Sequence, residues 1–294
     1  MTDLLDRLEV ALGERYAIER ELGRGGTSVV FLARDLHRGS RVALKVLRPE
    51  VASVVGKERF LREIGLATRL RHPHIVGLIE AAEAEECLYF SMPFVAGESL
   101  RERLGREPQL AATDAVRITC EVAEALAYAH GEGVVHRDIK PENLLISSGR
   151  ILVTDFGLGK ALDAAGGTSL TESGLALGTA AYISPEQAAG EGRLDGRSDL
   201  YSLGVVLYEM LAGVQPFVAP TRQQVVAMRF VQPPPPLTAV RNDVSETLAA
   251  VVGRMLAVSP ADRLGTARDL IVALRELSPA SPSARDSTLR PASP

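Results

Sequence analysis

The hydrophobic pattern of the chain changes near residue 95, and this change limits the fold more than any other feature. Before it, short apolar and β-branched runs alternate with Gly- or charge-rich turns, which is typical of strands. These runs are YAIEREL (16–22), SVVFLARD (28–35), RVALKVL (41–47) and CLYFSMPF (87–94), with one helix expected over about 56–70. From about residue 99 onward helical periodicities dominate, as in 113–130 and 198–213. We therefore expect a small, sheet-rich unit followed by a larger helical one.

The composition excludes several classes of protein. A chain of 294 residues with 46% hydrophobic residues can bury a sizeable core. A formal net charge of −4 indicates no broad basic face, so nucleic acid is not an expected partner. The two cysteines, Cys87 and Cys120, form neither a disulfide framework nor a metal-binding pair, which favours a cytoplasmic protein with reduced thiols. No secretory signal and no apolar window of about 18 residues is present, so we expect no membrane span in this chain.

A glycine-rich stretch, GRGGTSVV at 23–30, indicates a phosphate-binding loop. By itself it allows three nucleotide-binding folds. A dinucleotide-binding fold would require a helix directly after the glycines, and a Walker loop would require Lys followed by Ser or Thr. Here the loop continues into a β-branched strand instead. We therefore expect a hairpin that covers a nucleotide from above.

One lysine, Lys45, lies among apolar residues on the expected strand 41–47, and such a lysine requires an anionic partner. On the expected helix that follows, Glu63 lies on the same face as the apolar stripe that includes Phe60 and Ile64. We therefore expect Glu63 to pair with Lys45 and leave the lysine to hold phosphate oxygens. A surface lysine with a solvated glutamate is the simpler alternative.

Three further motifs occur in order: VVHRDIKPEN at 134–143, ILVTDFGLGK at 151–160 and GTAAYISPEQ at 178–187. Together with the loop and Lys45, they give the chain a clear resemblance to bacterial, eukaryotic-like (Hanks-type) serine/threonine protein kinases over about residues 14–277. The resemblance implies an α+β, bilobal protein-kinase fold. An antiparallel-sheet N-lobe with one main helix would cover about 14–94 and a mostly helical C-lobe about 95–277. Residues 1–13 would be an N-terminal extension, and the Ser/Pro-rich residues 278–294 a disordered tail.

The resemblance also assigns the chemistry. Asp138 would orient the acceptor hydroxyl and accept its proton, and Lys140 would reach the transferred phosphoryl group. Asn143 and Asp155 would hold magnesium, which manganese could replace, with ATP as the phosphoryl donor. Thr179 would support Asp138 and Lys140 and shape the acceptor surface. The residues expected around ATP are Leu22, Gly23, Arg24, Gly25, Gly26, Thr27, Ser28, Val30, Ala43, Lys45, Met92, Val95 and Leu145.

Other residues would hold the site together. The resemblance makes His136 a packing residue beneath Phe156 rather than a base. Glu186 would form a buried ion pair with Arg263, and Asp199 would tie the catalytic loop to the large lobe. The chain departs from the family pattern at Ser28 (a third glycine), at Ser184 (usually alanine) and at Pro93–Phe94, where an acidic residue and an aromatic are common.

The function implied is transfer of the ATP γ-phosphate to Ser or Thr of protein substrates, including autophosphorylation at Thr171 or Ser173. The Lys of DIKPEN favours Ser/Thr over Tyr acceptors. A pseudokinase acting as a nucleotide-sensing scaffold is the main alternative, and a small-molecule phosphotransferase is a third. Relatives often dimerise through the small lobe, which would allow autophosphorylation in trans. A longer chain that continued past residue 294 could carry a membrane tether.

Overall fold

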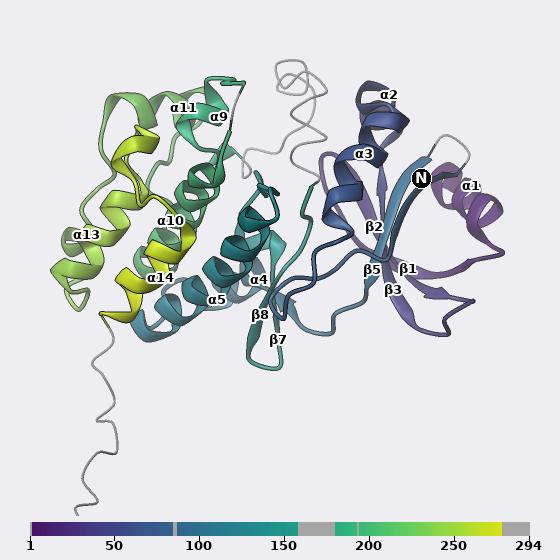
Figure 1. Cartoon of the computed structure of the whole chain (residues 1–294), viewed down its shortest axis with the longest axis horizontal. Coiled ribbons are helices and arrows are strands. Elements are labelled where there is room, and N and C mark those ends of the chain that lie inside the picture. The colour runs from purple at the N-terminus through teal and green to yellow at the C-terminus, as the bar shows by residue number, and fades with distance from the viewer. Residues whose placement is uncertain (1, 85–86, 158–179, 193, 278–294) are drawn as a thin grey trace, which may run out of the picture.

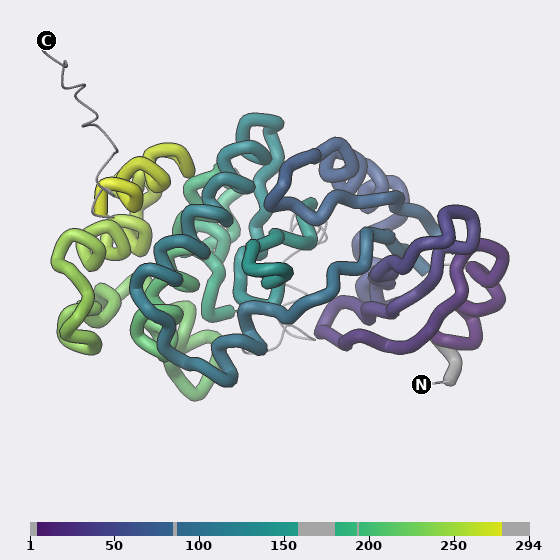
Figure 2. Tube along the Cα trace, turned by 90° about the horizontal axis from the view of Figure 1, so that it is seen from below, coloured from purple at the N-terminus to yellow at the C-terminus, as the bar shows by residue number. Residues whose placement is uncertain are grey.

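The computed structural model describes residues 2–84, 87–157, 180–192 and 194–277. In this part of the chain the early strands gather in one lobe and the later helices in a second, larger lobe, side by side along the long axis (Figure 1). Figure 2 shows the same separation from below, with the purple and blue N-terminal part at one end and the yellow C-terminal helices at the other. The predicted α+β, bilobal fold is therefore confirmed. Thr171, Ser173 and Thr179 lie outside the described residues.

The small lobe is built on a five-stranded antiparallel sheet with strand order β1-β2-β3-β5-β4. Residues in the middle of β2 and β3 are almost all buried, so both faces of the sheet are covered. A strand covered on both faces has no need of polar residues at alternate positions, which explains the continuous apolar runs of these two strands. The strands are β1 (Tyr16–Arg24), β2 (Ser28–Asp35), β3 (Arg41–Leu47), β4 (Glu80–Ala84) and β5 (Cys87–Pro93).

The glycine-rich loop turns one strand directly into the next, as the sequence predicts. β1 ends at Arg24 and β2 begins at Ser28. The N–H of Gly25 donates to the carbonyl of Ser28 at 2.8 Å and closes the turn. The N–H of Arg48 donates to the carbonyl of Thr27 at 2.9 Å and ties the loop to the end of β3. The loop is thus a hairpin in register with the strand that carries Lys45.

The helix predicted over about 56–70 is present as α3 (Lys57–Ala67), and a separate short helix that the sequence analysis did not predict, α2 (Pro49–Val55), precedes it. Gly56 separates them with φ of +73°, a left-handed conformation that glycine adopts readily and that interrupts a helix. The buried face of α3 contains Phe60, Glu63 and Ile64, which is the stripe that the sequence predicts.

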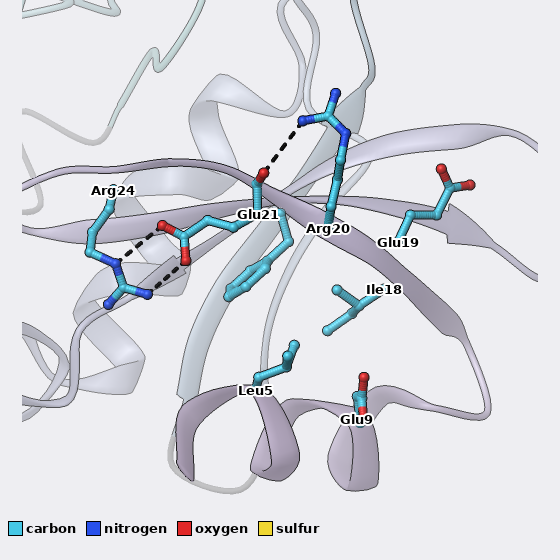
Figure 3. Close-up of a pocket in the computed structure, with 8 residues that line it drawn as sticks. Leu5, Glu9, Ile18, Glu19, Arg20, Glu21 and Arg24 are labelled. Atoms are coloured by element: carbon cyan, nitrogen blue, oxygen red, sulfur yellow. Dashed lines mark hydrogen bonds and ion pairs between the residues drawn. The ribbon is translucent and has the colours of Figure 1, made fainter. Parts of the chain in front are cut away.

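The first helix, α1 (Thr2–Leu12), packs against the face of the sheet away from α3 (Figure 1). Leu8 and Leu12 are 0% and 5% exposed and share an apolar cluster with Phe31. A cavity of about 190 Å³ remains between α1 and the sheet, lined by Leu5, Ile18, Phe31 and the charged side chains around them (Figure 3). The segment predicted as an extension is therefore a cover for the sheet.

The large lobe is mostly helical, with a three-stranded sheet of order β6-β7-β8 where it meets the small lobe. Its helix α5 packs against α10 and α14, and α10 lies at the centre. The elements are β6 (Glu98–Ser99), α4 (Leu100–Arg106), α5 (Ala112–Gly131), η1 (Pro141–Asn143), β7 (Leu144–Ser147), β8 (Arg150–Val153), α9 (Pro185–Ala188), α10 (Gly196–Ala212), α11 (Arg222–Val231), α12 (Leu237–Val240), α13 (Glu246–Met255), η2 (Pro260–Asp262) and α14 (Ala267–Arg275).

Helix α10 is buried on every side, from Ser198 to Ala212. A helix that is covered all round must carry small residues where neighbours approach closely. Gly204 is such a position, since a Cβ added there would lie 2.7 Å from the Cβ of Met255 on α13. The helix begins with Asp195, whose carboxylate accepts from the N–H of Arg197 at 2.9 Å. It ends at Gly213 in the left-handed conformation.

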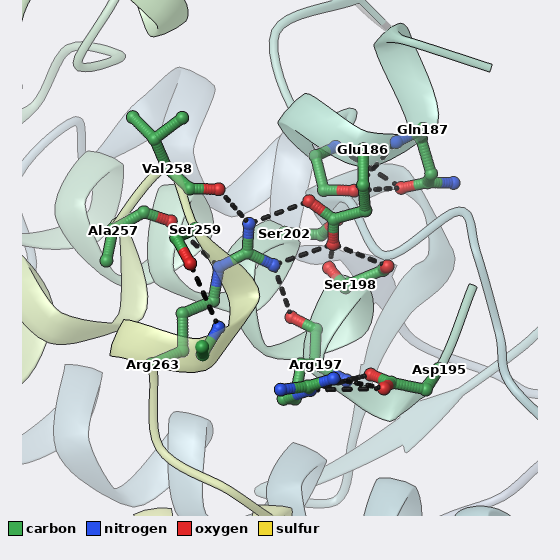
Figure 4. Close-up of polar contacts among 12 residues, drawn as sticks. Glu186, Gln187, Asp195, Arg197, Ser198, Ser202, Ala257, Val258, Ser259 and Arg263 are labelled. Atoms are coloured by element: carbon green, nitrogen blue, oxygen red, sulfur yellow. Dashed lines mark hydrogen bonds and ion pairs between the residues drawn. The ribbon is translucent and has the colours of Figure 1, made fainter. Parts of the chain in front are cut away.

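The predicted buried ion pair of the large lobe is present. Arg263 donates from Nη1 and Nη2 to the two carboxylate oxygens of Glu186, each at 2.7 Å (Figure 4). Ser198 donates to the same carboxylate at 2.6 Å. Burial alone would raise the pKa of Glu186, but the bonds from Arg263 and Ser198 lower it below its ordinary value. The remaining Arg263 donors bind backbone carbonyls, including that of Arg197 at 2.9 Å.

Glu186→Gln should lower the free energy of unfolding by about 3 kcal/mol or more, because a buried guanidinium loses its counter-charge. Arg275→Gln is a matched control, since Arg275 pairs with Glu124 at 2.8 Å but its side chain is 67% exposed. That variant should stay within about 0.5 kcal/mol of wild type. Urea unfolding followed by circular dichroism measures both. Equal losses in the two variants would contradict the structural role of the buried pair.

Candidate active site

The loop at residues 134–143 is held by a carboxylate from the central helix. Asp199 of α10 is 0% exposed and accepts from the backbone N–H of His136 at 2.8 Å and of Arg137 at 2.7 Å. His130 Nε2 lies 2.8 Å from the same carboxylate. Burial alone would raise the pKa of Asp199, but the His130 hydrogen bond, the nearby imidazoles and the Arg137 N–H lower it. The tie predicted between Asp199 and the loop is thus present.

The loop is strained at the residue before its acid. Arg137 has φ of +68°, which residues with a side chain rarely adopt. Such a conformation persists only where surrounding contacts fix it. Asp199 supplies one of these contacts through the Arg137 N–H. Arg137 thus connects the buried His136 to Asp138, which is partly exposed.

Three polar side chains of the loop converge. Lys140 Nζ lies 2.9 and 2.7 Å from the two carboxylate oxygens of Asp138. Asn143 Nδ2 donates to the Asp138 carbonyl at 2.8 Å and to its Oδ2 at 3.0 Å. The Asp138 side chain remains 27% exposed, so a hydroxyl can reach it. Because the Asn143 amide nitrogen is used on Asp138, its amide oxygen points elsewhere and is free to bind a cation.

The acid of the DFG motif meets the lysine of β3. Lys45 Nζ lies 2.6 Å from Asp155 Oδ2, with the two side chains 12% and 7% exposed. Asp155 has φ of +68°. Its other oxygen, Oδ1, is buried and has no hydrogen-bond partner among the described residues. A buried, unpartnered carboxylate oxygen, together with the amide oxygen of Asn143, fits a hard cation such as Mg²⁺.

The predicted ion pair between Glu63 and Lys45 is not formed. Lys45 pairs with Asp155 instead. Gly157 packs closely on α3, where a Cβ added to it would lie 3.3 Å from the Glu63 carbonyl oxygen. Glu63 lines a hollow of about 140 Å³ that it shares with Arg137 and Gly157. Its carboxylate also lies 3.6 Å from Arg62 Nε. The catalytic role expected for Glu63 stays a prediction.

His136 packs as predicted and its hydrogen bonds define its tautomer. Its ring lies edge-on to Phe156 with centroids 4.6 Å apart. Nε2 lies 2.7 Å from the Thr154 carbonyl, which can only accept, so Nε2 carries the proton. Nδ1 then accepts from the Asp138 N–H at 3.2 Å. Both nitrogens are occupied, so the ring positions Asp138 and has no free position for proton transfer.

The chain matches the family described as "Protein kinase domain" over residues 16–272. It belongs to the protein kinase family. It is 40% identical over 263 residues to the serine/threonine-protein kinase pkn3 of Myxococcus xanthus, covering 86% of this chain and 48% of that protein. It is 40% identical over 265 residues to PknB of Mycolicibacterium smegmatis, covering 88% and 42%, and 41% identical over 260 residues to PknJ of Mycobacterium bovis, covering 86% and 43%. The chain thus spans less than half the length of these relatives.

The kinase gathers most of the expected adenine-side residues around one apolar cluster. Ala43 and Met92 face each other in the register of β3 and β5 and are 8% and 6% exposed. Leu22, Val30 and Val95 pack against the same cluster. Leu145 lies at the edge of the large lobe, paired with Leu152 in the register of β7 and β8.

The polar residues expected around ATP lie along the loop itself. The Arg24 side chain points along β1, where it forms two hydrogen bonds to Glu21, at 3.1 and 2.7 Å (Figure 3). Ser28 is 4% exposed and opposes Leu47 at the start of β2. Their contacts with a nucleotide stay predictions.

Sequence reasoning missed one polar cluster of this kinase. Arg101 at the start of α4 donates to Glu142 of η1 and to Glu209 of α10, both at 2.8 Å. The hydroxyl of Tyr182 bonds to Arg101 and to Glu209, and burial raises the pKa of that hydroxyl. Gln215 donates to it at 2.9 Å. These partners come from five separate segments, so no local pattern could have indicated the cluster.

Asp199→Asn should lower the free energy of unfolding at pH 7 by about 3 kcal/mol, because a buried donor loses its charged acceptor. The folded pKa lies below the unfolded value of about 3.9, so the ionised form stabilises the fold above that value. This stabilisation is lost as the pH falls through the folded pKa. The difference between variant and wild type should therefore shrink below about pH 5 in urea unfolding.

The exposed Asp262 provides the control for this measurement. Asp262→Asn should differ from wild type by less than about 0.5 kcal/mol at any pH. A difference for Asp199→Asn that stayed constant with pH would contradict the stabilisation by its ionised form.

Proposed function

We propose that the chain transfers the γ-phosphate of ATP to Ser or Thr hydroxyls of protein substrates. The observation that carries the proposal is the Asp138 carboxylate, partly exposed and held by Lys140 and Asn143 within 3.0 Å. A carboxylate so placed can orient an acceptor hydroxyl and take its proton. The Lys of DIKPEN and the names of the relatives support Ser/Thr acceptors.

The other residues supply position and charge. Phosphoryl transfer requires the attacking and leaving oxygens in line and the spreading negative charge neutralised. Lys140 lies beside Asp138, where its positive charge would stabilise the γ-phosphoryl group during transfer. Lys45, now paired with Asp155, would exchange that partner for phosphate oxygens when ATP binds. The apolar residues around Met92 and Ala43 would contact the adenine.

Magnesium is the metal that the donor set favours, and manganese, which shares its preference for oxygen ligands, would replace it. Asp155 and the amide oxygen of Asn143 would hold it. When bound, the ion neutralises charge on the phosphate oxygens and holds them in place. Among the described residues no cluster of three or more His, Cys, Asp or Glu could hold a metal alone. This agrees with a site completed by the phosphates of the substrate.

Asp138→Asn should lower kcat for a generic basic protein by about 10²–10⁴-fold, because the variant cannot accept the hydroxyl proton. The amide keeps the size of the side chain, so circular dichroism should be unchanged. Asp114→Asn, an exposed site on α5, is the matched control and should keep wild-type activity. Transfer of labelled phosphate from ATP is the measurement, and full activity of Asp138→Asn would refute the assigned base.

Lys45→Met should also lower kcat, by at least about a hundredfold, through the lost charge at the phosphates. It leaves the Asp155 carboxylate buried without its ion pair, so the melting temperature should fall too. Lys57→Met is the control, since its side chain is 56% exposed. A wild type that bound Mg·ATP without transferring phosphate would favour the pseudokinase alternative.

We also propose autophosphorylation at Thr171 or Ser173, in trans between two copies of a cytoplasmic enzyme. A phosphate there would find positive charge near Arg137, beside the catalytic acid. Intact-mass spectrometry should show added phosphate after ATP, reduced in a Thr171→Ala/Ser173→Ala double variant and kept in Thr168→Ala/Ser169→Ala. The initial rate should rise with the square of protein concentration; a first-order rate would contradict transfer in trans.

Within the part of the chain that the structure describes, every helix is too short or too polar to span a bilayer. The residues at 138–143 and 155 support phosphoryl transfer, and the segment 180–187 supports a protein acceptor over a small molecule. A small-molecule acceptor would have no use for the Glu186–Arg263 pair that anchors this segment.

A further inference from the structure

The amide of Gln187 is held at both ends. Its Oε1 accepts from the backbone N–H of Ser184 at 3.2 Å and from the Ser184 hydroxyl at 3.1 Å, which forms the capping box of α9. Its Nε2 donates to the backbone carbonyl of Arg137 at 2.9 Å, across 50 residues of sequence. Figure 4 shows the side chain beside Glu186 at the start of α9. One side chain thus contacts both the acceptor segment and the catalytic loop.

The carbonyl that Gln187 binds belongs to the peptide group directly before Asp138. The N–H of the same peptide group donates to His136 Nδ1 at 3.2 Å. The preceding N–H, that of Arg137, donates to Asp199 at 2.7 Å. Arg137 is the residue with φ of +68°, and a peptide in that conformation keeps its orientation only where its groups are fixed. Gln187 Nε2 is the donor that fixes its oxygen.

We propose that Gln187 is a positioning residue for phosphoryl transfer. Its Nε2 holds the Arg137–Asp138 peptide group, and through it the orientation of the Asp138 carboxylate toward Lys140 and Asn143. Rotation of that peptide would move the carboxylate by an ångström or more, and a displacement of about 1 Å can cost about 10²-fold in rate. The proposal rests on the function proposed above for Asp138.

The simpler role for Gln187 is to cap α9 and nothing more. A capping box accepts Glu as readily as Gln at this position, and a carboxylate is favoured near a helix N-terminus. A cap alone would therefore tolerate Gln187→Glu fully and would suffer from Gln187→Lys, which removes the acceptor. Positioning of the peptide requires a donor, so it predicts the reverse order. The two roles can be separated by one pair of variants.

The experiment compares wild type, Gln187→Glu, Gln187→Lys and Ser184→Ala with the same peptide substrate and Mg·ATP. We expect kcat of Gln187→Glu to fall at least about tenfold with the KM for ATP within about twofold. Gln187→Lys keeps a donor and should keep a kcat several-fold above that of Gln187→Glu. Ser184→Ala loses only the hydroxyl of the cap and should lower the melting temperature with kcat within about twofold of wild type.

Amide hydrogen exchange provides a readout that does not depend on turnover. In Gln187→Glu the amides of residues 138 and 139 should exchange faster than in wild type, while amides in α10 should not change. The proposal is overturned if Gln187→Glu matches or exceeds Gln187→Lys in kcat, or if exchange in the loop is unaltered. If wild type transfers no phosphate, the proposed function fails and so does a role in turnover, while the exchange data still decide whether Gln187 holds the loop.

Discussion

The buried carboxylate of Asp199 fixes the reaction centre, because two successive backbone N–H groups of the catalytic loop depend on it. A carboxylate with no exposure is costly unless each of its oxygens is bonded, and here both are. The bonds hold Arg137 in its left-handed conformation. That conformation in turn places Asp138 beside Lys140 and Asn143.

Another charged contact, the Lys45–Asp155 ion pair, joins the two lobes. Lys45 belongs to β3 of the small lobe and Asp155 follows β8 of the large one, and each is nearly buried. Beside them the chain that connects α3 to β4 is itself paired with β8. The Val76 N–H donates to the Val153 carbonyl, and the Val153 N–H to the His74 carbonyl, both at 2.9 Å. The backbone hydrogen bonds and the ion pair therefore fix Asp155, the proposed metal ligand, against the strand that carries Lys45.

Much of this arrangement could be predicted from the sequence, because the chemistry depends on short spacings. Asp138, Lys140 and Asn143 lie within one loop, so their convergence follows from local geometry once the loop is recognised. The Lys45–Asp155 pair was not predicted, because the two residues are 110 positions apart in the sequence and the helical pattern indicated Glu63 as the partner of Lys45 instead. The residues of the cluster around Arg101 come from five separate segments, so no local sequence pattern indicates it.

The packing of helix α1 on the small-lobe sheet is a different case, because the sequence contained the pattern that indicates it. The runs in β2 and β3 have no polar alternation, which indicates burial on both faces. α3 can cover one face only, and the amphipathic segment at residues 2–12 was available for the other. Gly56, by contrast, shows what the sequence pattern could not predict. A glycine in a helical pattern either continues the helix or interrupts it depending on its φ, and periodicity cannot distinguish the two cases.

Helix α10 contacts both the loop at residues 134–143 and the segment before α9 through three polar residues on one side of the helix. Asp199, Ser202 and Glu209 fall within about 80° of one another around its axis. Asp199 binds the catalytic loop, the Ser202 hydroxyl donates to the Tyr182 carbonyl at 2.8 Å, and Glu209 binds the Tyr182 hydroxyl. The loop that carries Asp138 and the segment that precedes α9 are thus both held by hydrogen bonds to one buried helix. Since that helix is close-packed on every side, their relative position is set by the core of the large lobe rather than by either loop.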